Sequence, residues 1–253
     1  MDKLVIQGGA RLQGEVTVSG AKNAALPILC AALLAETPLK LSSVPKLKDV
    51  GTTIHLLEHM GVKASRQGDK VDLDASVIHT LEAPYEMVKT MRASILVLGP
   101  LLARFGKGFI PKPGGDKIGR RRLDTHFEGF TMLGAKFNYD LNEHFYSIEA
   151  EKLTGTYIHL DEASVTGTAN VLMAAVLAEG KTTIYNAACE PYLQQLCKML
   201  NNMGANITGI GSNMLHIEGV KELGGCFHRI LPDMIEIGSF IGLAAMTKSE
   251  ITI

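Results

Sequence analysis

The sequence lacks a strong net charge and a paired-cysteine motif, and each absence excludes a class of protein. Its 253 residues include 25 Lys and Arg against 26 Asp and Glu, a formal net charge of −1. A general nucleic-acid-binding domain is normally basic, so we expect no nucleic-acid partner. The four cysteines form no C-x-x-C pair and no zinc spacing, which predicts reduced thiols in the core of a cytoplasmic protein. They are Cys30, Cys189, Cys197 and Cys226.

The sequence also lacks a signal peptide and a membrane-spanning stretch. Its first residues do not combine a charged region with an apolar one. The longest apolar run, residues 24–35, is much shorter than the roughly 20 residues that a spanning helix needs. We therefore expect a cytoplasmic protein without a membrane partner.

A repeated unit is present instead. Residues 31–37 align without a gap with residues 174–180, and the same offset carries Met60-Gly61 onto Met203-Gly204. Leu133-Gly134 lies midway, and residues 244–250 repeat the pattern once more. The spacing predicts a repeat of about 70 residues.

Each unit has the same predicted order of elements. A strand (residues 15–18 or 157–160) precedes a wholly apolar helix (24–35 or 169–178), which a second strand follows (39–44 or 182–185). An amphipathic helix then ends at Met-Gly or Leu-Gly, where glycine can adopt the left-handed conformation, and a hairpin closes the unit (62–66 with 70–73). A helix that is apolar all round must be buried on every side, which favours an α/β fold (α+β repeats) of helices enclosed by sheets. The fourth unit, from about His228, stops after its first helix, so the chain is expected to end within a unit.

The segment from Pro113 to Asp124 combines flexible backbone with positive charge. It contains three glycines, and its cationic residues are Lys117, Arg120, Arg121 and Arg122. Guanidinium groups on a flexible loop suit phosphate or carboxylate binding, and Asp116 within that loop is a candidate proton carrier. A solvated charge run is the alternative for the arginine triplet.

Two further cationic positions precede apolar helical runs. Lys22 and Asn23 begin one run and Arg92 another, where the positive end of a helix favours an anion. The alternatives are a surface lysine beside a turn and an ordinary surface ion pair. Ser164-Val165-Thr166-Gly167 opens the third apolar helix and could hydrogen-bond a ligand or cap the helix. Glu190 and Asp233, at strand or loop ends, could orient basic groups, and unpaired surface carboxylates are the alternative.

One metal-like motif is rejected. His55-x-x-Glu58-His59 matches the pattern of inverted zinc peptidases, but the repeat places Lys198 and Asn202 opposite the two histidines. The positions therefore behave as the polar face of a repeated helix, and we expect no metal.

Together these residues resemble the UDP-N-acetylglucosamine 1-carboxyvinyltransferases, a family of enolpyruvyl transferases. A shikimate-pathway relative shares the fold but not these strings. The resemblance runs along the whole chain and is carried by residues 12–27, 44–50, 89–94, 113–115, 121–124, 177–180, 186–188 and 231–233.

The resemblance implies an inside-out α/β barrel, in which each of two domains consists of three repeats of helices enclosed by sheets. Residues 22–232 would form one complete domain. Residues 1–21 and 233–253 would belong to a second domain, most of which is absent from this chain. Neither a cofactor nor a metal is implied, and the oligomeric state stays open.

The implied reaction transfers enolpyruvyl from phosphoenolpyruvate to the 3-hydroxyl of UDP-N-acetylglucosamine and releases phosphate, which opens peptidoglycan precursor synthesis. The implied catalytic residues are Asp116, Lys22 and Arg121. The implied substrate-binding residues are Lys22, Asn23, Arg92, Arg121, Arg122, Leu123, Asp124, Thr125, Glu162, Ala163, Ser164 and Val165.

Some positions depart from the family pattern. Asp116 stands where many members have a catalytic cysteine, which predicts insensitivity to fosfomycin and requires a raised pKa if this carboxyl is to act as an acid. Glu162 replaces a lysine seen in some members, and Met234 and Ile237 replace a commoner arginine and threonine. Two alternatives stay open: an inactive fragment with residual nucleotide-sugar binding, and a shikimate-pathway transferase that uses shikimate 3-phosphate.

Overall fold

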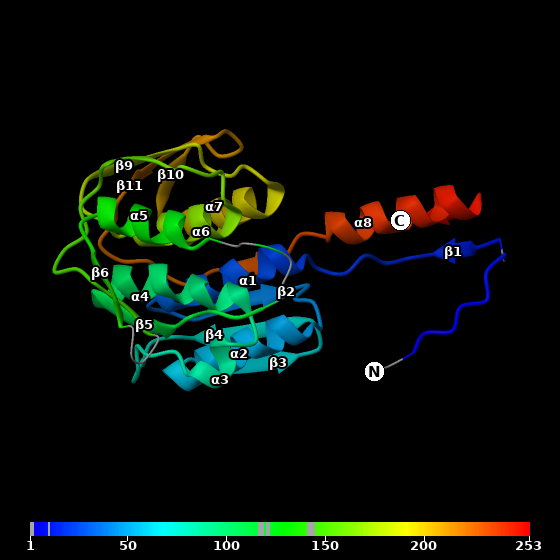
Figure 1. Ribbon diagram of the computed structural model, residues 1–253, viewed down its shortest axis with the longest axis horizontal. Helices are drawn as coiled ribbons and strands as arrows, with labels where there is room; N and C mark the ends of the chain where they lie inside the picture. Colours follow the sequence, from blue (N-terminus) through cyan, green and yellow to red (C-terminus); the bar gives the residue numbers. More distant parts are fainter. Residues whose placement is uncertain (1–2, 10, 116–118, 120–121, 141–144) are drawn as a thin grey trace.

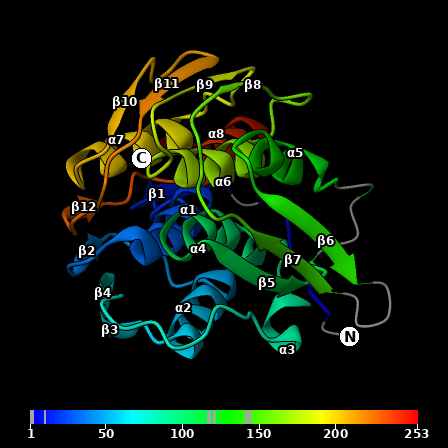
Figure 2. The same cartoon turned by 90° about the vertical axis from the view of Figure 1, so that its left-hand side faces the viewer.

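Three sheets with similar strand order enclose the central helices of the protein (Figure 2). The computed structural model describes residues 3–9, 11–115, 119, 122–140 and 145–253. The sheets have the orders β12-β2-β4-β3, β5-β7-β6 and β8-β9-β11-β10, and in the second sheet residue Glu82 bridges in parallel to Phe109 at the position of a fourth strand. In the two four-stranded sheets the first pair of strands is parallel and the others are antiparallel. This recurrence agrees with the repeat predicted from the sequence.

The strands are short. Those of the first sheet are β12 (Phe227–Arg229), β2 (Leu39–Ser42), β4 (Lys70–Asp74) and β3 (Lys63–Gln67). Those of the second are β5 (Lys107–Pro111), β7 (Phe145–Glu149) and β6 (Lys136–Asp140). Those of the third are β8 (Tyr157–His159), β9 (Lys181–Tyr185), β11 (Met214–Glu218) and β10 (Asn206–Thr208).

The apolar helices lie at the centre, inside the three sheets (Figure 2). They are α1 (Lys22–Ala31) with η1 (Ala32–Leu34), η2 (Arg92–Val97) with α4 (Leu98–Phe105), and α6 (Val165–Ala175). Every residue of α1 from Ala24 to Ala31 is buried, as is every residue of α6 from Gly167 onward. The prediction of helices that are buried all round is confirmed, and this packing removes most of their apolar surface from water.

The amphipathic helices cover the centre from outside. They are α2 (Lys48–Met60), α5 (Asp124–Met132) and α7 (Pro191–Asn202), with a short α3 (Tyr85–Val88) beside them. The glycines predicted to end these helices, Gly61, Gly134 and Gly204, have φ of 115°, 100° and 111°. They adopt the left-handed conformation that glycine tolerates without a Cβ clash, so this prediction is confirmed.

The predicted first strand of the first unit is wrong. Strand β1 is Gln13–Glu15, and it pairs in parallel with β13 (Glu250–Thr252), outside the three sheets. The chain enters the body where Ala21 N–H donates to the Leu231 carbonyl at 2.8 Å. The preceding residues are thereby directed away from the first sheet. Strand β12 pairs in parallel with β2 at the edge where the first strand of the unit was predicted.

Helix α8 (Met234–Thr247), β13 and the N-terminal segment extend from the body as an arm (Figure 1). Helix α8 is rich in apolar residues, yet none of its residues is buried. Ile235, Ile241 and Met246 are among its exposed side chains. The arm therefore contributes nothing to the core of the body.

The cysteines divide between core and surface. Cys30 and Cys197 are buried, and burial raises the pKa of each thiol to about 12, which keeps it protonated. Cys226 is partly buried, but Cys189 is exposed, so the expectation that all four lie in the core is wrong for Cys189. No helix among the described residues is long and apolar enough to cross a membrane.

Candidate functional site

The first turns of the three central helical segments converge on one small pocket of about 160 Å³. Segments α1, η2 and α6 contact one another in pairs at this point. The first N–H groups of a helix have no acceptor within the helix, so this end of the bundle attracts anions. The pocket is lined by Asn23, Leu26, Pro27, Ala93, Leu96, Val165, Thr166, Ala169 and Tyr192.

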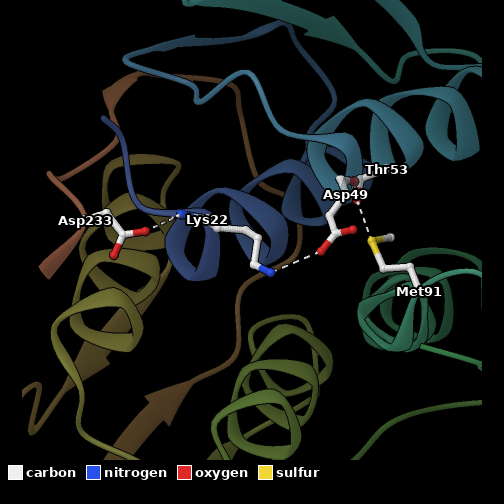
Figure 3. A network of polar contacts seen from close by, with 5 residues as sticks. All are labelled: Lys22, Asp49, Thr53, Met91 and Asp233. Atoms are coloured by element: carbon white, nitrogen blue, oxygen red, sulfur yellow. Dashed lines mark hydrogen bonds and ion pairs between the residues drawn. The ribbon is translucent and has the colours of Figure 1, made fainter. Parts of the chain in front are cut away.

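Lys22 begins α1 at the rim of this convergence, between two carboxylates (Figure 3). Its Nζ lies 3.2 Å from Oδ2 of Asp49 on α2, and its backbone N–H donates to Oδ2 of Asp233 at 3.4 Å. Asp233 also caps α8 by accepting from Ile235 N–H at 2.9 Å. Asp233 thus contacts the backbone of Lys22 and not its ammonium, and the suggested role of orienting a basic group stays a prediction.

A second set of contacts leads from α2 toward Arg92. The Thr53 hydroxyl donates to the Asp49 carbonyl at 2.9 Å and lies 3.8 Å from Sδ of Met91, the residue before Arg92 (Figure 3). Lys22 and Arg92, far apart in sequence, therefore begin two helical segments, α1 and η2, that contact each other.

Arg92 connects the pocket to the start of α5. Its Nη2 donates to the carbonyl of Arg122 at 2.7 Å. The Arg122 side chain turns to carboxylates: Nε donates to Asp124 at 2.5 Å, and Nη2 lies 3.6 Å from Asp161. The hydrogen bond to Asp124 is the main cause of the raised pKa of Arg122.

Asp161 joins the two segments that the resemblance assigns to the nucleotide sugar. Its Oδ1 accepts from the hydroxyl of Thr125 at 3.0 Å, while Oδ2 faces Arg122. Residues 122–125 and 162–165 therefore lie side by side. Leu123 is buried in the core, whereas Glu162 and Ala163 are exposed.

Ser164 is the N-cap of α6, with its Oγ accepting from Gly167 N–H at 3.2 Å. The capping alternative is therefore present in the structure. Val165, the next residue, lines the pocket.

A buried polar network lies directly behind the pocket. His126 is 2% exposed, and its Nδ1 lies 3.0 Å from Nδ2 of Asn170 while its Nε2 lies 3.3 Å from the hydroxyl of Thr166. Burial, and then the positive charge of Arg92, lower the pKa of His126 to about 3. Sequence reasoning did not find His126 and Asn170, whereas Thr166 belongs to the segment that was expected to bind a ligand or cap the helix. The available signal was an amide side chain, Asn170, within an otherwise apolar helix.

The glycine loop starts beside Arg92. An added Cβ at Gly114 would lie 1.7 Å from the Lys89 carbonyl oxygen, and one at Gly115 would lie 3.0 Å from the Arg92 backbone nitrogen. Close approach to another backbone segment therefore requires glycine at position 114, and Gly115 has a φ of 105°, which also favours glycine. Asp116, Lys117, Arg120 and Arg121 lie outside the described residues.

The rejected zinc motif lies on an exposed face of α2, where Nδ1 of His55 lies 2.9 Å from Glu58. Within the described ranges, no group of three or more His, Cys, Asp or Glu side chains could hold a metal ion.

Central helices enclosed by three sheets are also the fold of solved enolpyruvyl transferases. The enolpyruvyl transferase NikO from Streptomyces tendae superposes with a TM-score of 0.83 at 21% identity, covering 93% of this chain and 56% of that one. An EPSP synthase from Acinetobacter baumannii superposes with a TM-score of 0.74 at 19% identity, covering 94% and 54%.

The sequence profile of the family described as EPSP synthase (3-phosphoshikimate 1-carboxyvinyltransferase) matches residues 6–253. The chain belongs to this family.

Curated relatives carry a more specific name. The chain is 56% identical over 260 residues to a UDP-N-acetylglucosamine 1-carboxyvinyltransferase of Bacteroides thetaiotaomicron, and 57% identical over 258 residues to one of Bacteroides fragilis. The relative from Porphyromonas gingivalis is 56% identical over 261 residues. All of this chain is matched in each case, and it spans 59% of the length of these relatives.

Proposed function

We propose that this chain carries one substrate-binding face of a UDP-N-acetylglucosamine 1-carboxyvinyltransferase in the cytoplasm. The observation that carries the proposal is the convergence of three helix starts, with Lys22 and Arg92 beside them, on one pocket. The names of relatives 56–57% identical over the whole chain support the same assignment. Helix starts with adjacent cations suit a substrate that carries phosphate and carboxylate groups.

The reaction requires one proton donor and a site for anions. An acid protonates the methylene of phosphoenolpyruvate while the sugar 3-hydroxyl adds to the adjacent carbon and loses its proton. Loss of a proton from the new methyl group and departure of phosphate then restore the double bond. Asp116 is proposed as the acid, and Lys22 and Arg121 as the cations that neutralise phosphate and carboxylate.

Asn23 is proposed to contact the reacting centre from the pocket wall. The nucleotide sugar is proposed to bind along Arg92, residues 121–125 and residues 162–165. The hydrogen bonds that join Arg92 to Arg122 and Thr125 to Asp161 support this placement, because they hold these segments side by side.

Residues 22–232 are proposed as one complete domain, and residues 1–21 and 233–253 as parts of a second. The crossing of the chain at the bridge between Gly20 and Pro232 supports this boundary. The uncovered apolar surface of α8 supports it as well, because a helix rich in apolar residues is normally packed against a partner.

The function is tested by following phosphate release with phosphoenolpyruvate and UDP-N-acetylglucosamine together. Calorimetric titration of UDP-N-acetylglucosamine alone then tests binding without turnover. Binding without phosphate release would indicate a fragment that binds but does not catalyse. Phosphate release with shikimate 3-phosphate but not with the nucleotide sugar would contradict the proposal.

A pair of lysine variants tests whether substrate binding depends on Lys22. Lys22→Met is expected to weaken binding of phosphoenolpyruvate, and Lys70→Met serves as its control, because Lys70 is an exposed lysine on β4. Equal losses in the two variants would argue against a specific role for Lys22.

A further inference from the structure

The orientation of the Asn170 side chain is determined by its backbone partners. Asn170 is fully buried on α6, and its Oδ1 accepts from Gly99 N–H at 2.8 Å. Because a backbone N–H only donates, the atom facing it must be the amide oxygen. The amide nitrogen Nδ2 therefore donates to the Ile95 carbonyl at 2.9 Å and faces Nδ1 of His126 at 3.0 Å.

This orientation determines which nitrogen of His126 carries the proton. Nδ1 must accept from the Asn170 amide, so a neutral imidazole carries its hydrogen on Nε2. Burial keeps the ring neutral, with its pKa lowered to about 3. The Nε2–H group then donates to the hydroxyl oxygen of Thr166 at 3.3 Å.

Thr166 is left with one hydrogen to donate. Within the described part of the chain, His126 is the only hydrogen-bond partner of its hydroxyl. Thr166 lies in the first turn of α6 and lines the pocket together with Asn23 and Tyr192. The pocket wall is otherwise mainly apolar, and a volume of about 160 Å³ admits a small group but not a nucleotide.

We propose that Thr166 is a ligand-binding residue whose hydroxyl donates a hydrogen bond to an acceptor oxygen of the substrate group in this pocket. His126 and Asn170 are positioning residues: the donation from His126 occupies the Thr166 oxygen and leaves its hydroxyl hydrogen for the ligand. The inference rests on the proposed function, since the ligand is one of its two substrates. A carboxylate, carbonyl or phosphoryl oxygen fits this donor.

The primary test compares two substitutions of one side chain. Thr166→Val removes the hydroxyl at nearly constant volume, and Thr166→Ser keeps it. Calorimetry of the 253-residue chain with UDP-N-acetylglucosamine alone, with phosphoenolpyruvate alone and with both identifies the substrate that occupies the pocket. For that substrate, Thr166→Val is expected to bind about tenfold more weakly and Thr166→Ser to stay within about twofold of the parent chain.

The outcomes separate the two proposals. If the parent chain binds the substrates and Thr166→Val binds both equally well, the inference is overturned and the proposed function stands. If the parent chain binds neither substrate, the proposed function is contradicted and the inference with it.

A second comparison tests the positioning role of His126. In His126→Gln the amide nitrogen can replace Nε2 as the donor to Thr166, whereas in His126→Asn the side-chain oxygen can replace Nδ1 but the donor is lost. We expect affinity within about twofold of the parent for His126→Gln and about threefold to tenfold weaker binding for His126→Asn. In a Thr166→Val background the two variants should have equal affinity. If His126→Asn lowers the affinity further in that background, His126 has only a structural role, and the proposed positioning role is overturned.

The tautomer of His126 can be measured without substrate, and without any variant that must fold. Nitrogen-15 NMR of the labelled chain should show a neutral ring with its proton on Nε2 at pH 7. A ring protonated on Nδ1, or one carrying a positive charge, would overturn the inference whatever the chain binds.

Discussion

The Lys22 ammonium lies 3.2 Å from the carboxylate of Asp49, and this contact joins the central helix α1 to the outer helix α2. Both side chains are substantially exposed, at 44% and 37%. Figure 3 shows the pair bridging the starts of α1 and α2, and neither side chain is buried. A bound anion would therefore compete with Asp49 for the same ammonium.

Removing Asp49 and removing Lys22 should affect anion binding differently. Asp49→Asn should leave the affinity for phosphoenolpyruvate unchanged or raise it, whereas Lys22→Met should weaken it about tenfold or more. Each change should alter the free energy of unfolding by less than about 1 kcal/mol, because exposed ion pairs contribute little. Calorimetry and urea unfolding measure the two effects. A loss of affinity in Asp49→Asn equal to that in Lys22→Met would show instead that Asp49 holds Lys22 in place.

His126 should make the stability of the fold depend on pH. Its pKa is about 3 in the folded state and about 6.5 unperturbed. The unfolded chain therefore binds the proton more readily between these values. The stabilising effect is fully present above pH 6.5, and it declines by up to about 1.4 kcal/mol per pH unit as the pH falls toward 3. Urea unfolding from pH 7.5 to pH 4.5 measures this slope, with His126→Gln as the control. Identical slopes in the two proteins would contradict the buried neutral state.

Asn170 should be much less tolerant of truncation than a surface asparagine with the same hydrogen-bond pattern. Asn170→Ala leaves Gly99 N–H and the Ile95 carbonyl unpaired in the core, which should cost about 2–4 kcal/mol of unfolding free energy. Asn201 also binds one backbone N–H and one carbonyl, both of Ile207, at a partly exposed site that water can reach. Asn201→Ala should therefore cost about 1 kcal/mol. Equal costs in denaturant unfolding would count against this account.

Gly114 should tolerate no side chain. The added methyl of Gly114→Ala would lie 1.7 Å from the Lys89 carbonyl oxygen, so the loop beside Arg92 must move. We expect a loss of stability of at least about 2 kcal/mol and weaker binding of UDP-N-acetylglucosamine. The control is Gly51→Ala on α2, where the added methyl meets no atom within 4 Å outside the adjacent helix backbone and helix propensity favours alanine by roughly 0.5–1 kcal/mol. Wild-type stability of Gly114→Ala would contradict the close contact.

Asp116 should make the chain unreactive toward fosfomycin. The reagent alkylates a thiol in cysteine-bearing relatives, and a carboxylate is a much weaker nucleophile than a thiolate. Intact-mass spectrometry after incubation should show no adduct on the parent chain and a single adduct on Asp116→Cys. Ready modification of the parent chain at Asp116 would refute the prediction.

The repeat was sufficient to predict three similar units with central apolar helices, because a helix that is apolar on every face has no other place to lie. It was not sufficient to predict which strand completes each sheet. Residues 15–18 and 227–229 occupy equivalent positions in their units, and only the crossing of the chain near Gly20 and Pro232 decides between them. Such a choice depends on contacts between distant residues, which local patterns do not encode.

The helix starts were predicted as parts of an anion site, since cations before apolar runs can be read directly from the sequence. The network behind the pocket was not predicted, because the partners of His126 come from α6 and depend on packing. Arg122 pairs with Asp124 and Asp161 in the structure, and its binding of substrate stays a prediction.

The place of β12 beside β2 has a consequence for synthesis on the ribosome. Strand β2 is made early, but its outer edge receives its parallel partner only when residues 227–229 have emerged. Until then a row of backbone donors and acceptors is open to pairing with other chains. The nascent protein therefore passes through a period of exposure to aggregation, which ends only when β12 has paired with β2.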